Sequence, residues 1–372
     1  MASGTDRVRS STLEAIGETP LVRLHRLAPP GGTEVLVKLE YFSPTGSYKD
    51  RMARAMIEGA ERRGKLHPGM SVVEFTGGST GSSLAFVCAV KGYPLKLVSS
   101  DAFSPEKLRT MRAFGAELTI VPSRGGTITP DLFDRMWEVV EEIVARDGAY
   151  WTDQFHNTDS LAGYAGIGRE LLAQAGTGID AFCGGVGVAG MLVGVSQALK
   201  AAANATRIVA LEPASSPFIS TGVGGPHRVE GIGTGMVPPL LTPGTYDDVC
   251  AIDESEARAM ARRLAREEGI FAGVSTGLNV VAALRLAEEL GPAHTVATVA
   301  VDTGLKYLAG DLYEDSGAPQ GGLIDRVLTP LLHVARMRRP TPDLCSPPGS
   351  GSPLSVGSCR AARYREALAV SD

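Results

Sequence analysis

Short apolar runs rich in β-branched residues alternate along the chain with longer segments of helical periodicity. This alternation is typical of βαβ units, in which crossover helices join parallel strands. The pattern therefore predicts an α/β fold built on parallel sheets. We expect strands over residues 34–39, 71–75, 95–99, 118–121, 181–183, 207–211 and 295–301, and helices over residues 50–63, 82–91, 105–114, 130–147, 164–174, 191–203 and 254–268.

The predicted elements fall into two groups. The strands around Val73, Leu97 and Ile120 recur with short crossover helices, which indicates a small doubly wound unit, and a second unit begins near Asp180. After about residue 318 the composition shifts to Pro, Ser, Gly and Arg without apolar periodicity. Such a segment cannot bury enough apolar surface to pack. We expect residues 318–372 to form a flexible tail.

Composition excludes several classes of partner. The 372 residues carry a formal net charge of −5, so no bulk attraction to nucleic acid or to an anionic membrane is expected. No uncharged apolar run approaches the ~18 residues needed to span a bilayer, and the first twelve residues lack the apolar core of a signal peptide. The five cysteines are odd in number and widely spaced, which predicts neither a metal site nor a disulfide framework. We expect a soluble, cytoplasmic protein.

Two glycine-rich turns lie between a predicted strand and a predicted helix, at residues 74–83 and 182–190. Such turns present backbone N–H groups and a positive helix end to an anion. The second turn has GxGxxG spacing at Gly185, Gly187 and Gly190, and the next strand ends in Glu212. This arrangement leaves a nicotinamide dehydrogenase open as an alternative. The motif lies in the middle of the chain, however, and accounts for none of the other glycine loops.

A third segment, residues 38–51, places Lys49 after a Pro-Thr-Gly-Ser turn and at the start of a helix. The positive end of a helix disfavours a protonated amine and would assist a Schiff-base lysine. Taken alone, this pattern is more typical of an exposed lysine. The segments become informative only in combination.

In combination, seven motifs occur in the order and spacing of one family: SPTGSYKDR, TGGSTG, DQFHN, GGVGVAG, EGIGTG, EEGIFAGVSTG and DTGLKYLAGDLY. Over residues 10–313 the chain resembles the cysteine synthase and cystathionine β-synthase family of fold-type II pyridoxal-phosphate enzymes. The resemblance implies two doubly wound α/β domains with pyridoxal 5′-phosphate in the cleft between them. It assigns residues 1–44 and 156–317 to a larger domain that binds the cofactor phosphate, and residues 45–155 to a smaller domain that clamps the substrate.

The resemblance also implies roles for individual residues. Lys49 matches the Schiff-base lysine, which would also remove the substrate α-proton. The residues that match cofactor contacts are Lys49, Ser79, Gly185, Gly187, Val188, Ala189, Gly190, Met191, Gly231 and Ser275. Those that match contacts to the substrate carboxylate are Thr76, Gly77, Gly78, Ser79, Thr80 and Gln154.

Several positions depart from the family pattern. Ser79 stands where the family has an asparagine, and Gly77 replaces a serine. In the phosphate loop, Val188 and Met191 replace two threonines and Ala189 replaces a glycine. We expect cofactor binding to survive, weakened by on the order of 1 kcal/mol for each lost hydroxyl hydrogen bond.

The activity implied is that of a homodimeric transferase acting on a small amino acid. It would carry out β-replacement on an activated serine such as O-acetylserine, through an aminoacrylate, with a small nucleophile, by default sulfide, in cysteine biosynthesis. The first alternative is a β-eliminating, deaminating lyase, such as a serine or threonine dehydratase or a cysteine desulfhydrase. The second is a catalytically silent homologue that serves as a binding scaffold.

Overall fold

The structure is a computed structural model that describes residues 8–28, 32–126, 130–176, 178–202 and 205–314. These residues belong to one compact unit that spans residues 1–320. The tail predicted over residues 318–372 lies outside the described residues. No helix in the described part of the chain is both long and apolar enough to cross a bilayer.

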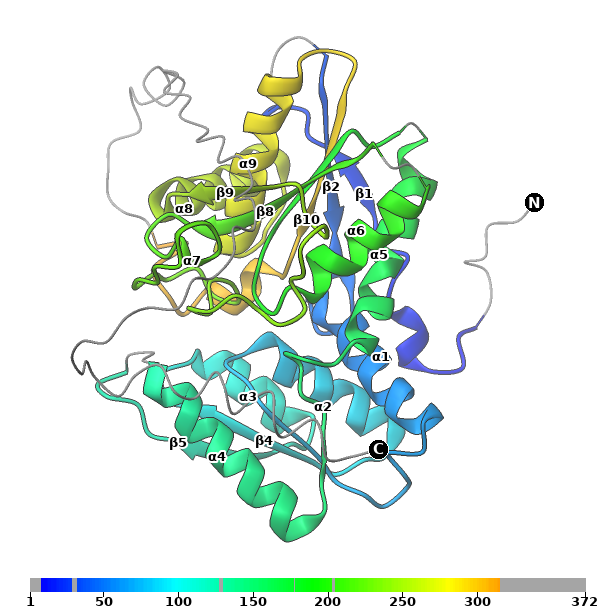
Figure 1. Ribbon diagram of the computed structural model, residues 1–372, viewed down its shortest axis with the longest axis vertical. Coiled ribbons are helices and arrows are strands. Elements are labelled where there is room, and N and C mark those ends of the chain that lie inside the picture. The colour runs from blue at the N-terminus through cyan, green and yellow to red at the C-terminus, as the bar shows by residue number, and fades with distance from the viewer. Residues whose placement is uncertain (1–7, 29–31, 127–129, 177, 203–204, 315–372) are drawn as a thin grey trace, which may run out of the picture. The chain divides into compact units, whose positions relative to one another are not determined.

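Two sheets organise this unit (Figure 1). The six-stranded sheet has the order β1-β2-β10-β7-β8-β9, and the four-stranded sheet has the order β5-β4-β3-β6. β1 pairs antiparallel with β2, and all other pairings are parallel. The strands are β1 (Leu21–Arg23), β2 (Glu34–Leu39), β3 (Val72–Phe75), β4 (Leu95–Ser100), β5 (Glu117–Val121), β6 (Tyr150–Trp151), β7 (Ala181–Gly185), β8 (Arg207–Pro213), β9 (Asp248–Ile252) and β10 (Thr295–Ala300).

The helices join and cover these strands. They are α1 (Lys49–Arg62), α2 (Ser79–Lys91), α3 (Pro105–Ala113), α4 (Pro130–Asp147), α5 (Asp159–Ala175), α6 (Gly190–Ala202), α7 (Phe218–Thr221), α8 (Glu254–Arg263) and α9 (Val274–Leu290). Short turns are η1 (Thr12–Ala15), η2 (Glu40–Phe42), η4 (Gly304–Tyr307) and the π-helical η3 (Leu264–Glu268). α1 packs against both α2 and α5, so it connects elements that cover the two sheets.

Both faces of the six-stranded sheet are apolar. In β2, Val35 and Val37 belong to the core beneath α8 and α9, whereas Leu36 belongs to the core that includes α1, α5 and α6. Side chains alternate between the two faces of a strand, so a run with no polar alternation marks a strand covered on both sides. The core around α1 also takes in Leu84 and Leu97 from the four-stranded sheet and its helices, and so extends across both sheets.

The predicted α/β class and the parallel sheets are confirmed, and each strand and helix expected from the pattern is present with shifts at its ends. α9 was missed, together with α7, the short turns and the strands β1, β6 and β9. α9 is buried along most of its length, including Asn279 and Ala283, so it lacks the polar face by which an amphipathic helix is recognised. The domain boundaries near residues 44 and 155 stay a prediction.

Candidate active site

Lys49 is the first residue of α1 and is buried, with 7% of its surface exposed. Its position is set by the preceding residue, because the Tyr48 N–H donates to the Val301 carbonyl at 3.1 Å. Burial lowers the pKa of the Lys49 ammonium to about 8, and the charge of Glu74 opposes this shift. The amine is therefore far more often neutral at pH 7 than an exposed lysine.

The turn before Lys49 is closed by its neighbour on the helix. The buried Asp50 carboxylate accepts hydrogen bonds from the Thr45 N–H at 2.8 Å and from the Thr45 hydroxyl at 2.6 Å. Arg51 donates to Glu40 and to Glu170, which fastens α1 to η2 and α5. The sequence Lys-Asp-Arg thus presents the amine on one side of α1 and anchors the helix through its next two residues.

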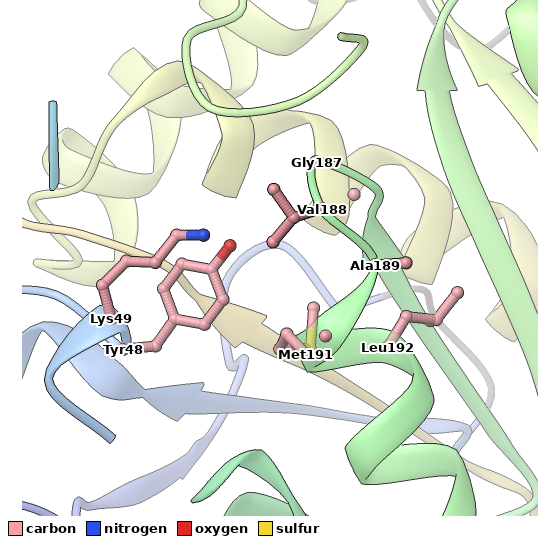
Figure 2. A pocket seen from close by; sticks show the side chains of 9 residues that line it. Tyr48, Lys49, Gly187, Val188, Ala189, Met191 and Leu192 are labelled. Carbon is pink, nitrogen blue, oxygen red and sulfur yellow. The ribbon is translucent and has the colours of Figure 1, made fainter. Parts of the chain in front are cut away.

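A small cavity separates Lys49 from the glycine loop that follows β7 (Figure 2). Tyr48 and Lys49 face Val188 and Met191 across this cavity. Its lining residues are Tyr48, Lys49, Gly185, Gly187, Val188, Ala189, Gly190, Met191 and Leu192. The loop runs into the N-terminus of α6, where backbone N–H groups lack partners within the helix. The lysine and the glycine loop predicted from the sequence therefore lie around one space.

Close backbone packing explains the glycine at position 187. A Cβ atom there would overlap the carbonyl oxygen of Gly231, which belongs to the loop after α7. That second loop is held by the Gly233 N–H, which donates to the Val186 carbonyl at 3.0 Å. Gly231 itself has a φ of +86°, a conformation that suits glycine. The motifs EGIGTG and GGVGVAG are thus packed against each other.

Asn279, on α9, fixes the end of β7 at the cavity. Its side-chain oxygen accepts the Gly185 N–H at 2.8 Å, and its amide donates to the Val299 carbonyl at 2.9 Å. The side chain is fully buried. Ser275, at the start of the same helix, is also buried. Sequence reasoning missed Asn279, although an asparagine within an apolar helical run was a signal.

The turn from β3 into α2 contains the residues that match the substrate clamp. Thr76 Oγ1 accepts the N–H of Gly78 at 3.1 Å and of Gly81 at 3.3 Å, which shapes the turn. The Thr80 hydroxyl donates to Gln154 Oε1 at 2.8 Å. The structure thus brings Thr80 and Gln154 together from distant parts of the chain. Gly77 has no room for a side chain, because an added Cβ would lie 2.5 Å from the Phe103 ring.

Ser79 lies beside a cluster of charged groups. Its hydroxyl donates to Asp302 at 3.4 Å, and Lys306 Nζ lies 3.5 Å from the same oxygen. Tyr307 donates its hydroxyl to Asp302 at 3.0 Å. Burial raises the pKa of Asp302 and lowers that of Lys306. This contact between the clamp turn, residues 76–80, and the segment after β10 was not expected from the sequence.

The donors around the cavity suit a phosphorylated aldehyde such as pyridoxal phosphate. The amine of Lys49 can bind an aldehyde carbon, and the backbone N–H groups between Gly187 and Met191 can bind a phosphate. Val188 and Met191 contribute no hydroxyl, so the donors that these two residues can offer to an anion are backbone N–H groups.

Known proteins resemble this chain in sequence. A family model described as "Pyridoxal-phosphate dependent enzyme" matches residues 12–302. The chain is 42% identical over 302 residues to a cysteine synthase of Staphylococcus aureus, which covers 81% of this chain and 96% of that protein. It is 38% identical over 318 residues to an O-ureido-L-serine synthase of Streptomyces lavendulae, with 84% and 96% covered.

A solved structure gives the same result at the level of the fold. The crystal structure of cysteine synthase from Entamoeba histolytica superposes with a TM-score of 0.80 and 33% identity, covering 87% of this chain and 95% of that chain. The family match spans both sheets and includes Lys49, the glycine loop and the clamp turn. The chain therefore belongs to the pyridoxal-phosphate-dependent enzymes of fold-type II, and within them it is an enzyme of the cysteine synthase type.

Proposed function

We propose that this enzyme replaces the leaving group on the β-carbon of a small activated serine, such as O-acetylserine, with a small nucleophile. Sulfide is the default nucleophile, and the product is then cysteine. The observation that carries the proposal is the buried Lys49 amine facing the glycine loop across one cavity. The names of the related enzymes support the substrate class, because they include cysteine synthase and O-ureido-L-serine synthase.

In this proposal Lys49 both holds the cofactor and moves a proton. The bound cofactor supplies an electron sink for negative charge at the substrate α-carbon. The Lys49 amine, once it is released from the cofactor, accepts the α-proton at Nζ. A pKa of about 8 suits this task, because the neutral amine is then populated near neutral pH.

The remaining site residues position the cofactor and the substrate. We assign the cofactor phosphate to backbone N–H groups of Gly187, Val188, Ala189, Gly190 and Met191 next to Gly185, and further cofactor contacts to Ser79, Gly231 and Ser275. We assign the substrate carboxylate to the turn made of Thr76, Gly77, Gly78, Ser79 and Thr80, together with Gln154. The turn ends at the N-terminus of α2, and the positive end of a helix favours an anion.

We also propose that the enzyme acts in the cytoplasm as a homodimer. Cys88, Cys183 and Cys250, the cysteines among the described residues, are free thiols, which is typical of a reducing compartment. Phe42, Leu305 and Leu308 are exposed and apolar, and a subunit contact over them would remove this apolar surface from water.

Replacing Lys49 tests the assignment. We expect Lys49→Ala protein mixed with pyridoxal phosphate to lack the visible absorption of a lysine-bound cofactor and to lose turnover by a factor on the order of 10³ or more. The matched control is Lys65→Ala, because Lys65 is exposed and does not line the cavity. A Lys49→Ala enzyme with normal turnover would contradict the proposal.

Product analysis separates replacement from elimination. Wild-type enzyme given O-acetylserine with and without sulfide should form cysteine in place of pyruvate when sulfide is present. Pyruvate formation unaffected by sulfide would instead identify a lyase. Failure of the wild-type protein to bind pyridoxal phosphate would identify a silent scaffold.

A further inference from the structure

A buried carboxylate that the proposed reaction does not use lies next to the substrate turn. Glu74 is on β3, two residues before Thr76, and its side chain is fully buried. Removing a carboxylate from water is expensive unless the protein supplies hydrogen bonds to its oxygens. The hydrogen-bond donors to Glu74 therefore indicate its role.

These partners are all donors, and several come from the segment at the end of β6. Glu74 Oε2 accepts the Thr152 hydroxyl at 2.6 Å and the Gln154 N–H at 3.0 Å. Glu74 Oε1 accepts the Phe75 N–H at 3.0 Å and the Trp151 indole N–H at 3.4 Å. The carboxylate thus binds residues on both sides of position 153.

Position 153 needs such support. Asp153 has a φ of +44°, in the left-handed region that favours glycine and that aspartate enters more often than most other residues. Strained backbone of this kind persists only where the surroundings hold it, and it is concentrated at functional sites. Glu74 contacts the residue before Asp153 and the residue after it, and the Asp153 carbonyl accepts the N–H groups of His156 and Asn157. The carboxylate is therefore one of the groups that hold this turn in its shape.

The turn determines where the Gln154 side chain lies. Gln154 Nε2 donates to the Phe75 carbonyl at 3.0 Å, and Gln154 Oε1 accepts the Thr80 hydroxyl at 2.8 Å. Both Gln154 and Thr80 are buried. A continuous chain of hydrogen bonds therefore leads from Glu74 through Gln154 to Thr80 in the substrate turn.

We propose that Glu74 is a positioning residue for the substrate carboxylate, which acts by holding the turn at Asp153 so that Gln154 orients Thr80. This inference rests on the proposed function, because it takes the turn of residues 76–80 as the carboxylate site. Glu74 itself is not among the residues that line the Lys49 cavity. Its charge also raises the pKa of Lys49, an effect that bears on every ligand that binds through its amine. Its loss should therefore weaken carboxylate binding more than binding through the amino group.

Binding of two ligands to the cofactor-loaded enzyme tests this selectivity. L-serine has a carboxylate, whereas serinol (2-amino-1,3-propanediol) carries a second hydroxymethyl group in its place, and both bind through their amine. We expect Glu74→Ala to raise the dissociation constant for L-serine about tenfold and that for serinol less than about twofold, both measured by visible absorption. With O-acetylserine, KM should rise by a larger factor than kcat falls.

A conservative variant and a matched control distinguish a loss of ligand affinity from a loss of folded protein. Glu74→Gln retains one oxygen acceptor in the same shape, so its loss of L-serine affinity should be smaller than that of Glu74→Ala. The control is Glu212→Gln: Glu212 is a buried carboxylate on β8 that accepts the Ile219 N–H and the Ser220 hydroxyl, and neither partner lines the Lys49 cavity. It should change neither ligand's affinity.

A double variant tests the route through Gln154. Because Glu74 acts through Gln154, Glu74→Gln combined with Gln154→Ala should lose no more L-serine affinity than Gln154→Ala alone. Equal losses of affinity for L-serine and serinol, additive effects in the double variant, or no loss at all would overturn the positioning role. If wild-type protein binds pyridoxal phosphate but neither ligand, the proposed function itself fails and the inference falls with it.

Discussion

At the scale of single residues, Ala189 has a strained backbone conformation within the glycine loop. Its φ is +67°, where an L-amino acid with a Cβ is strained by roughly 1–2 kcal/mol. Ala189→Gly relieves this strain and gives back about 0.4–1 kcal/mol through the greater freedom of the unfolded chain. We expect a net gain of about 0.5 kcal/mol in the free energy of unfolding of the cofactor-free protein, measured with urea.

Ala293 provides the comparison for this prediction, because its φ is +68° and it does not line the cavity. Ala293→Gly should give a gain of similar size and leave pyridoxal phosphate affinity unchanged. Lower stability of Ala189→Gly than of the wild-type protein would show that the Ala189 methyl group contributes packing that outweighs its strain.

The residues of the site differ in how far the sequence could predict them. Lys49 and the glycine loops stand in ordered local motifs, and the structure places them around one cavity. Asn279 and Glu74 carry no local motif, and their contacts join residues about 80 and 94 positions apart, Glu74 with Gln154 and Asn279 with Gly185. Such long-range contacts depend on the register of packed elements, which periodicity alone does not provide.

At the scale of elements, a buried network holds the helix that presents Lys49. Arg51 donates to Glu40 at 2.7 Å and to Glu170 at 2.7 Å, and Lys38 Nζ lies 2.7 Å from Glu170. These contacts join α1, η2, α5 and β2. The charged residues were visible in the sequence, but their pairing was not, because each comes from a different element.

This network makes stability depend on pH. Burial alone would raise the pKa of Glu170, but hydrogen bonds and charges from Arg51 and Lys38 outweigh it and lower the pKa to about 2. A carboxylate with a depressed folded-state pKa stabilises the protein above its unfolded-state pKa, near 4.5, and this contribution is lost as pH falls toward 2. We expect on the order of 2–3 kcal/mol to be lost in this window.

Urea unfolding at pH values from 6 to 3 would measure this contribution. Glu170→Gln should lower the free energy of unfolding at pH 6 and flatten its decline toward acid. The matched control is Glu58→Gln, which removes the partly exposed pair between Arg54 and Glu58. Such a pair is worth about 1 kcal/mol or less. An equally steep acid decline in the Glu170→Gln protein would contradict this account.

At the scale of the whole molecule, the proposed subunit contact lies close to the active site. Leu305 and Leu308 are 63% and 58% exposed, and they flank Lys306, whose amine lies 3.5 Å from the Ser79 hydroxyl. Thr303, just before them, donates its N–H to the Gly46 carbonyl at 3.0 Å, in the turn that leads to Lys49. One short segment therefore contacts both the turn that we propose for the substrate and the turn that leads to Lys49, and it also exposes apolar surface.

We expect the combined change Leu305→Glu and Leu308→Glu to convert a dimer into a monomer. The dimer would have to bury two unpaired carboxylates in an apolar contact, which costs free energy. Sedimentation velocity would report the change in mass. Val90→Glu is the control, since Val90 is also an exposed apolar residue but belongs to α2. A wild-type monomer, or a dimer that survives the double change, would place any subunit contact elsewhere. Lys306 of η4 contacts Ser79 in the substrate turn. Dissociation of the dimer should therefore lower the catalytic activity as well as the measured mass.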